Sequence, residues 1–188
     1  GGWIEGLGLC LELGIGIDGI LRKNRPKGIA RTALQIVAER GHVDAAEFLI
    51  SHRAMVGWKH GATALHVAAR AGQIPMMRFL FERGALETRL DHTDSGGNAL
   101  HCAAFGGCVE AVRLLQDIGL EIGSKDKLGN SAMIWAARSG QPEMCMFLEK
   151  SGVGVGREHG ELGSKLETGL HAVAARKTTV RIVSLREE

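Results

Sequence analysis

Tyrosine is absent from this 188-residue chain, and all aromatic residues together make up only 4% of it. Single-stranded nucleic acids bind proteins largely by stacking their bases on aromatic side chains, so this shortage disfavours that function. The four cysteines form no C-x-x-C pair, and the chain contains no N-x-S/T glycosylation sequence. These absences indicate a reducing, intracellular compartment, either cytoplasmic or nuclear.

The chain also lacks a long apolar run that is free of charge. Its most apolar stretch, residues 3–21, contains Glu5, Glu12 and Asp18, which is too much charge for a membrane span, and no secretory signal is visible. We therefore expect no contact with a membrane. With 45% hydrophobic and 23% charged residues, the composition is ordinary, and the length suffices for one continuous core.

What the chain does contain is an internal repeat. A short segment that begins with an apolar residue, continues with small residues and in most copies ends at glycine occurs five times. Its leading residues, separated by 31, 35, 33 and 37 positions, are Leu34, Leu65, Leu100, Met133 and Leu170. A period of this length indicates stacked repeats, in which one helix pair cannot bury its apolar face alone and is stabilised by its neighbours.

The repeated unit resembles the ankyrin repeat. The second copy, residues 61–73, reads G-A-T-A-L-H-V-A-A-R-A-G-Q, close to the family pattern G-x-T-P-L-H-x-A-A-x-x-G-H, although the proline is replaced in every copy. The resemblance covers about residues 5–185 and implies an all-α fold, a solenoid of stacked helix-turn-helix units joined by short β-hairpin loops. We expect one domain over 1–188, with a partial repeat at 1–26, repeats at about 27–57, 58–92, 93–125 and 126–162, and a partial C-terminal repeat at 163–188.

Both ends of the chain fall inside the pattern and the initiator methionine is missing, so we expect a fragment of a longer array. Residues with a side-chain oxygen stand where the first helix of each copy begins and are expected to cap it: Thr32, Thr63, Asn98, Ser131 and Thr168. Glycines at 41, 72, 107 and 140 are expected to close the first helices with positive φ, and those at 84, 119 and 152 the second helices.

Three short motifs resemble chemical sites but do not carry the chemistry. Residues 14–19 match G-x-G-x-x-G, yet the repeat register places them in an inter-repeat loop and not between a strand and a helix. Residues 94–96 match the aspartic protease triplet at a hairpin tip, without the second, opposed carboxylate. His101, Cys102 and Cys108 could surround zinc, but a fourth ligand is missing. We expect no enzyme activity, no cofactor and no metal.

The histidines have a structural interpretation. In the ankyrin family, the imidazole of the Leu-His pair hydrogen-bonds to turn backbone and ties neighbouring repeats together. The resemblance implies this role for His66, His101 and His171.

The resemblance also implies that a partner meets the hairpin tips and the exposed positions of the first helices, which line a concave face. The tips include Lys127, Leu128 and Asn130, and Trp58 and Trp135 are possible sources of aromatic area. Over all copies these positions hold eight positive and three negative side chains, although the whole chain carries only +2. The expected partner contacts are Arg40, Lys59, His60, Arg70, Phe105, Lys127, Arg138 and Arg176.

This basic surface predicts a non-catalytic protein-protein interaction module or adaptor fragment that binds an acidic or phosphorylated protein segment. Two other functions are open: a nucleic-acid-binding basic groove, and a small-ligand or enzymatic site on the same scaffold. A further alternative is that the arginines are solvated and only keep the array soluble.

Overall fold

The computed structural model of the chain describes residue 5 and residues 32–54, 56, 63–84 and 96–153. Within these ranges the chain forms helices in consecutive pairs and no strand. The pairs are α2 (Ala33–Arg40) with α3 (Val43–Ser51), α4 (Ala64–Ala71) with α5 (Ile74–Glu82), α6 (Ala99–Gly106) with α7 (Val109–Asp117), and α8 (Ala132–Arg138) with α9 (Pro142–Lys150).

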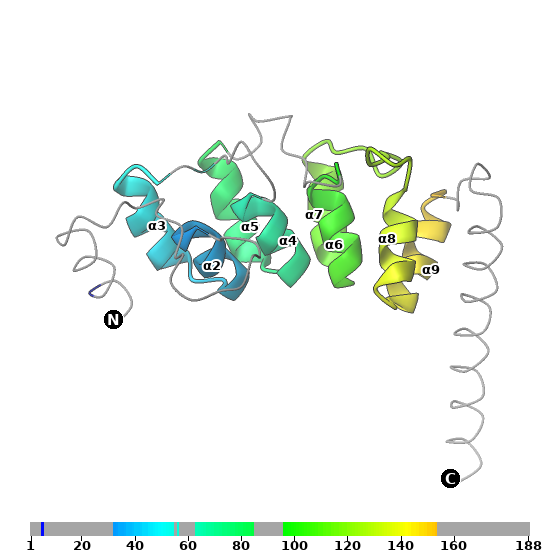
Figure 1. Ribbon diagram of the computed structural model, residues 1–188, viewed down its shortest axis with the longest axis horizontal. Helices are drawn as coiled ribbons and strands as arrows, with labels where there is room; N and C mark the ends of the chain where they lie inside the picture. The colour runs from blue at the N-terminus through cyan, green and yellow to red at the C-terminus, as the bar shows by residue number, and fades with distance from the viewer. Residues whose placement is uncertain (1–4, 6–31, 55, 57–62, 85–95, 154–188) are drawn as a thin grey trace, which may run out of the picture.

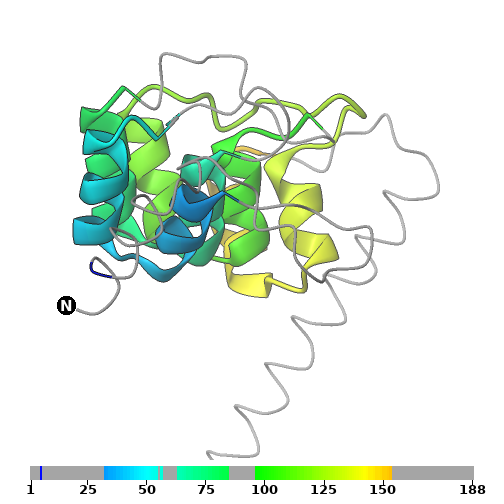
Figure 2. The same cartoon turned by 60° about the vertical axis from the view of Figure 1, so that its left-hand side comes forward.

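The helix pairs stand side by side in two layers (Figure 1). The first helices, α2, α4, α6 and α8, contact one another in sequence order, and each second helix packs on its own first helix. Contacts between neighbouring second helices are far fewer, and Figure 2 shows the same layering from another side. This arrangement confirms the predicted all-α solenoid. The inner layer of first helices therefore determines the spacing of the stack.

Reciprocal hydrogen bonds begin three of the four first helices. The hydroxyl oxygen of Thr32 accepts from the backbone N–H of Gln35 at 3.2 Å, and the Gln35 side-chain oxygen accepts from the Thr32 N–H at 2.9 Å. Thr63 and Asn98 make the same capping box, with a histidine ring in place of the glutamine. Such boxes satisfy N–H groups that a helix start leaves without a partner. The predicted caps at these three residues are confirmed.

The cap predicted at Ser131 is wrong. Its side chain makes no capping hydrogen bond to α8, and its hydroxyl is buried without a partner in the described part of the chain. The position three residues later, which holds a glutamine or histidine in the other helices, holds the apolar Ile134, so the reciprocal half of a capping box is absent as well. The backbone of Ser131 instead pairs with Lys125 in an antiparallel bridge. Thr168 lies outside the described residues.

Residues with a left-handed backbone conformation follow the helices, and all but one of them are the predicted glycines. φ is 73° at Gly41, 68° at Gly72, 78° at Gly107 and 73° at Gly140 after the first helices, and Gly84, Gly119 and Gly152 adopt positive φ after the second helices. After α3 this place is taken by Arg53, with φ of 68°, the only described residue other than glycine with positive φ. A side chain in this conformation costs about 1 kcal/mol, so Arg53 is locally strained.

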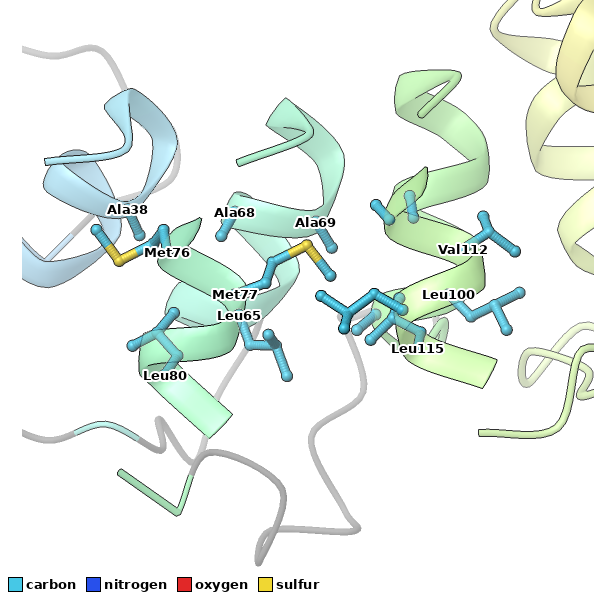
Figure 3. Close-up of a cluster of buried hydrophobic side chains, with 14 of the residues drawn as sticks. Ala38, Leu65, Ala68, Ala69, Met76, Met77, Leu80, Leu100, Val112 and Leu115 are labelled. Carbon is cyan, nitrogen blue, oxygen red and sulfur yellow. The ribbon is translucent and has the colours of Figure 1, made fainter. Parts of the chain in front are cut away.

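Small residues allow the first helices to approach one another closely. Buried alanines dominate their facing sides, and the second helices add larger side chains such as Met76, Met77, Leu80 and Leu115 (Figure 3). Between α4 and α6 the backbones approach closely at Gly106, where a Cβ atom would overlap the backbone carbonyl oxygen of Arg70. Here the backbones of two neighbouring repeats meet without an intervening side chain.

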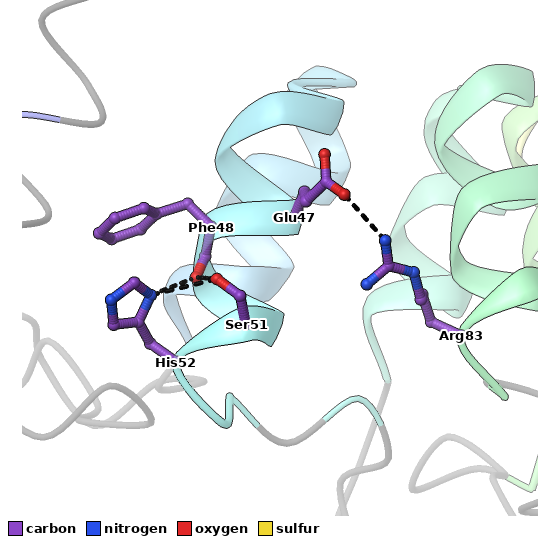
Figure 4. Close-up of polar contacts among 5 residues, drawn as sticks. All are labelled: Glu47, Phe48, Ser51, His52 and Arg83. Carbon is purple, nitrogen blue, oxygen red and sulfur yellow. Dashed lines mark hydrogen bonds and ion pairs between the residues drawn. The ribbon is translucent and has the colours of Figure 1, made fainter.

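The outer layer is tied by exposed charged residues. An Arg83 guanidinium nitrogen on the chain just after α5 lies 2.9 Å from a carboxylate oxygen of Glu47 on α3 (Figure 4). The same guanidinium lies 4.9 Å from the ring centre of Phe79, and that of Arg113 on α7 lies 5.4 Å from the ring centre of Phe147 on α9. Exposed pairs of this kind contribute at most about 1 kcal/mol each, so the inner contacts decide the stability of the stack.

The predicted repeat boundaries remain a prediction. The partial copies at 1–26 and 163–188 lie outside the described residues apart from Glu5. None of the helices in the described ranges has the length and apolar character needed to cross a membrane.

We expect Gly106→Ala to destabilise the protein by about 1–3 kcal/mol, because the added methyl group would push α6 away from the backbone of α4. Alanine has the higher helix propensity by about 1 kcal/mol, so a loss of stability would come from the contact and not from the helix. Gly123→Ala is the control, since a Cβ atom there meets nothing within 4 Å. Urea denaturation of both variants checks this; equal stabilities would show that α4 and α6 are not in backbone contact.

We expect Arg53→Gly to raise the free energy of unfolding by about 1 kcal/mol, because glycine adopts positive φ without strain. Arg53→Ala separates this effect from the removal of a charge, since alanine keeps the strain and should give no gain. Thermal denaturation of the two variants tests it, and a gain of equal size in both would attribute the effect to the charge.

Candidate functional site

The last turns of the first helices present a row of equivalent positions along the inner layer. These positions hold Glu39 in α2, Arg70 in α4, Phe105 in α6 and Arg138 in α8, and Arg40 follows Glu39 at the end of α2. The charged members are exposed and Phe105 is half-buried. We call these five residues the inner row. Because the four helices contact one another in order, the row places one such position on each successive helix of the stack.

Arg70 contacts the neighbouring repeat. Its guanidinium carbon lies 5.1 Å from the centre of the Phe105 ring, a cation-π contact that links α4 to α6. The close backbone approach at Gly106 brings the two side chains within reach. The guanidinium is therefore held against an apolar ring while its residue stays exposed.

On the opposite side, the nearest aromatic neighbour of Phe105 is Trp135 of α8. The two ring centres are 6.3 Å apart at an interplanar angle of 79°, an edge-to-face contact. Trp135 precedes Arg138 by three residues, and side chains at this spacing lie on the same side of a helix. The sequence of groups across the site is thus guanidinium, phenyl ring and indole ring.

Trp135 is a structural tie between repeats, which the sequence analysis did not recognise. Its Nε1–H donates to a carboxylate oxygen of Asp126 at 2.9 Å, and its ring lies edge-on to His101 with centres 5.5 Å apart. A Cβ atom on Gly97 would come within 2.6 Å of the indole ring, so glycine makes room for it. The equivalent positions of the other repeats hold the smaller side chains of Ile36, Val67 and Cys102. The replacement of a small side chain by an indole at this position is the sequence feature that could have predicted the tie.

Asp126 organises the loop between the third and fourth helix pairs. Its carboxylate accepts from the backbone N–H groups of Leu128 at 2.9 Å and Asn130 at 2.8 Å, from the Asn130 side-chain amide and from Trp135. Burial alone would raise the pKa of Asp126, but the hydrogen bonds from Asn130, Trp135 and Leu128 favour the charged form and lower it below its ordinary value. The carboxylate is therefore ionised at neutral pH.

Of the expected histidine ties, the one at His101 is confirmed. Its Nε2 lies 3.2 Å from the carbonyl oxygen of Asn130, which can only accept, so this ring nitrogen is the donor, and Nδ1 lies 2.7 Å from the Asn98 side-chain oxygen. The bond to Asn130 joins α6 to the next loop. His66 caps its own helix by accepting from the Thr63 N–H at 3.3 Å. His171 lies outside the described residues.

The loop from Lys125 to Ser131 carries the remaining described candidates. Lys127 is exposed, and its side chain lies against Gly96, where a Cβ atom would also come within 2.8 Å of the Lys127 backbone nitrogen. Leu128 is 67% exposed. Asn130, which the sequence analysis placed among the surface tips, is instead buried and bonded to Asp126.

Five of the eight expected contacts can be located. Arg40, Arg70, Phe105 and Arg138 belong to the inner row and Lys127 to the loop, whereas Lys59, His60 and Arg176 lie outside the described residues. Trp58, residues 14–19 and the first two residues of the 94–96 triplet also lie outside them.

Nucleophilic or metal chemistry finds little support in the described ranges. No group of three or more histidine, cysteine, aspartate or glutamate side chains gathers there to hold a metal ion. Burial raises the pKa of the Cys102 thiol to about 12, against a smaller lowering by Arg70, and burial also raises that of Cys145. Both thiols stay protonated at neutral pH, and a protonated thiol is a weak nucleophile and metal ligand.

One exposed pair resembles a serine-histidine dyad. Ser51 Oγ lies 3.2 Å from His52 Nδ1, but both atoms also lie 2.8 Å from the carbonyl oxygen of Phe48, which can only accept (Figure 4). The hydroxyl and the ring N–H are thus both used to satisfy the end of α3, and the serine is not activated by the histidine.

Comparisons with known proteins extend these observations. A family model described as ankyrin repeats (3 copies) matches residues 10–91 and 86–159. The chain is 34% identical over 144 residues to the transient receptor potential cation channel subfamily A member 1 homolog of Caenorhabditis elegans, 72% of this chain and 11% of that protein. It is 34% identical over 121 residues to a putative ankyrin repeat protein of Rickettsia felis, 62% of this chain and 37% of that protein.

A third relative is human ankyrin repeat domain-containing protein 63, 31% identical over 134 residues, which are 67% of this chain and 34% of that protein. The chain thus spans little more than a third of the length of any of these three relatives.

We expect Trp135→Phe to lower the free energy of unfolding at neutral pH by about 1–3 kcal/mol, since it removes one hydrogen bond to a charged carboxylate while keeping an aromatic ring. The bonds that lower the pKa of Asp126 stabilise the fold above its unfolded pKa of about 3.9, and this contribution is lost as the pH falls through the folded pKa. The difference between the two proteins should therefore shrink in acid.

Urea denaturation at a series of pH values measures this difference, and an NMR titration of the Asp126 carboxyl should show a higher pKa in the variant. Asp126→Asn serves as the control protein. In it, the loss of unfolding free energy caused by Trp135→Phe should not depend on pH, because position 126 no longer titrates. A stability difference that grows in acid would contradict the assignment of the bond.

Proposed function

Because the chain belongs to the ankyrin-repeat family, we propose that it is a non-catalytic protein-interaction module whose concave face binds an acidic or phosphorylated segment of a partner protein. Ankyrin repeats generally mediate protein-protein interactions, and homologues built from them are typically non-enzymatic scaffolds. The free cysteines at 102, 108 and 145 support an intracellular location, cytoplasmic or nuclear.

The contact of Arg70 with Phe105 carries this proposal. A guanidinium presents donors in a planar fork that matches a carboxylate or phosphate, and the ring beneath it limits its motion. A side chain already held in place loses less conformational entropy when a ligand binds. Phe105 adds apolar area beside the charge, so this point of the inner row can hold both parts of an acidic segment with an apolar residue.

The charge of the described surface favours an anionic ligand. Among the expected contacts and the inner row, Arg40, Arg70, Lys127 and Arg138 are positive, and only Glu39 is negative. All five residues are exposed, so they act on the ligand through water and give the binding a marked salt dependence.

The same charges would suit nucleic acid, but the rings of the described surface do not offer bases a platform. One face of the half-buried Phe105 ring lies against the Arg70 guanidinium, and Trp135 is fixed against Gly97 and Asp126. Base stacking needs an open ring face. A protein segment is therefore the better supported ligand.

We expect the double substitution Arg70→Glu with Arg138→Glu to weaken binding of anionic peptides by more than about tenfold, which corresponds to ~1.4 kcal/mol, because attraction becomes repulsion at two points of the inner row. The measurement is fluorescence anisotropy with a synthetic library of short peptides containing glutamate or phosphoserine. The melting temperature should change little, since both residues are exposed.

Arg78→Glu with Arg113→Glu is the matched control. It changes the net charge by the same amount on exposed positions of the second helices, and Arg113 also lies over a phenylalanine of the next repeat. Binding should survive in this control. Equal losses in both double variants would show that only the net charge matters, and the concave face would then not be the binding site.

A further inference from the structure

His101 is a fully buried histidine whose two ring nitrogens both face oxygen atoms that can only accept hydrogen bonds. Nε2 lies 3.2 Å from the backbone carbonyl oxygen of Asn130, and Nδ1 lies 2.7 Å from the side-chain oxygen of Asn98. A neutral imidazole has a single N–H. One ring proton therefore cannot serve both oxygens.

The side-chain amide of Asn98 is held in this orientation by other bonds. Its oxygen accepts from the backbone N–H of Leu100 at 3.1 Å and from that of His101 at 3.2 Å, which caps α6. Its nitrogen donates to Ser124 Oγ at 3.0 Å. Turning the amide around would direct its NH2 group at two backbone donors and remove the cap. The group that faces Nδ1 is therefore an acceptor.

The second repeat shows an arrangement that suits a neutral ring. There the residue opposite the ring is Thr63, whose Oγ1 lies 2.8 Å from Nδ1 of His66. A hydroxyl can donate to a bare ring nitrogen, so this ring needs no second proton. The first repeat pairs Thr32 with Gln35, which does not titrate. Among the repeats that the structure describes, an asparagine opposite a histidine occurs in the third.

Two hydrogen-bond states of His101 therefore compete. In the neutral ring, Nδ1 accepts from the backbone N–H of Asn98 over 3.3 Å, while the Asn98 side-chain oxygen faces the same lone pair. In the charged ring, Nδ1–H donates to that oxygen, and 2.7 Å is typical of a charge-assisted bond. Nε2–H donates to Asn130 in both states. The second proton thus exchanges a long bond for a short one and keeps the tie to the next loop.

Burial opposes a charged ring, so the charges around α6 matter. α6 packs on α4, α7 and α8, and the loop after α7 reaches the ring through Asn130. Apart from Asp126 and the thiols of Cys102 and Cys108, the titratable residues of these elements are exposed and screened by water: Arg70, Glu110, Arg113, Asp117, Glu121, Lys125, Lys127 and Arg138.

Two of these charges have a traceable connection to the ring. Arg70 acts on Cys102, the residue after His101, and disfavours a further positive charge, but its guanidinium is exposed. Asp126 is buried and ionised, and its carboxylate accepts from the side chain of Asn130, whose carbonyl oxygen faces Nε2. A buried charge is screened less than an exposed one, so the carboxylate prevails and favours the cation.

We propose that His101 binds a second proton in the folded protein and acts as a pH-dependent clamp between the third and fourth repeats. The charged ring holds the Asn98 cap of α6 with one N–H and Asn130 of the next loop with the other. Asn130 also binds Asp126, which fixes Trp135 of α8. The junction of the two repeats is thus tighter below neutral pH than above it, in the range in which histidine titrates.

A variant taken from the first repeat tests the clamp by stability. His101→Gln copies Gln35 and removes the titrating ring, and His66→Gln is the matched control in the second repeat. A proton held about tenfold more tightly by the folded protein stabilises it below the unfolded histidine pKa of about 6.5, and this contribution is lost as the pH rises further. Asp126 titrates well below this range.

Between pH values of about 5.5 and 8.5, we expect the unfolding equilibrium constant of the unsubstituted protein to rise about tenfold relative to that of His101→Gln. Relative to that of His66→Gln it should not rise. Urea denaturation at both pH values measures these ratios.

NMR of the histidine rings in the full chain detects the proton directly. At a pH of about 6, both ring nitrogens of His101 should carry hydrogen. In Asn98→Thr only Nε2 should, because a threonine hydroxyl can donate to Nδ1, and this variant should also lose the tenfold pH dependence. A His101 ring that stays neutral throughout the stable range of the fold, or a His101→Gln variant with the pH dependence of the unsubstituted protein, would overturn the clamp.

Discussion

The distance between neighbouring first helices is the constraint on which the rest of this structure depends. At Gly106 the backbone of α6 meets the backbone of α4, and buried alanines allow similar closeness along the inner layer. Van der Waals contact over this layer compensates for helices of only seven to eight residues, which would not be stable alone. The second helices, with larger side chains and fewer mutual contacts, close the core from outside.

The same closeness creates the candidate site. Helices this near allow the guanidinium of Arg70 to cross from one repeat to the phenyl ring of Phe105 on the next. Trp135 continues the row to the following repeat and fastens it to Asp126, which in turn fixes the loop that presents Lys127 and Leu128. Several contacts that link neighbouring repeats are thus also the contacts that orient the surface.

The helix boundaries could be predicted because they depend on local chemistry. Thr32, Thr63 and Asn98 cap their helices through atoms three residues away, and the left-handed glycines avoid strain that any other residue would have. The cap predicted at Ser131 is absent because its hydroxyl makes no bond to α8, although the backbone of Ser131 pairs with Lys125 at the base of the loop. Arg53 shows a second limit of prediction from local sequence. A non-glycine residue with an unfavourable positive φ is tolerated there because the surrounding helices stabilise the fold.

The site was harder to predict, because several of its defining contacts are made by side chains that the repeat pattern does not specify. Sequence position put Arg70 and Phe105 on the same face, but the tie from Trp135 to Asp126 and the burial of Asn130 arise from side chains particular to the loop and first helix of the fourth repeat. Repeat register predicts which positions lie in the inner row and not which of them are already engaged with a neighbour. Residues engaged in this way are the ones that give the surface its fixed shape.

Mapping the chemical-shift changes that a bound peptide causes onto the helices gives the most direct test of a concave binding surface. An NMR titration of the protein with a glutamate-rich peptide at low salt should move the indole N–H resonance of Trp135 and the amides in the last turns of α4, α6 and α8, while α5, α7 and α9 stay nearly unchanged. Shifts confined to the second helices, with the Trp135 resonance unmoved at saturation, would contradict the account.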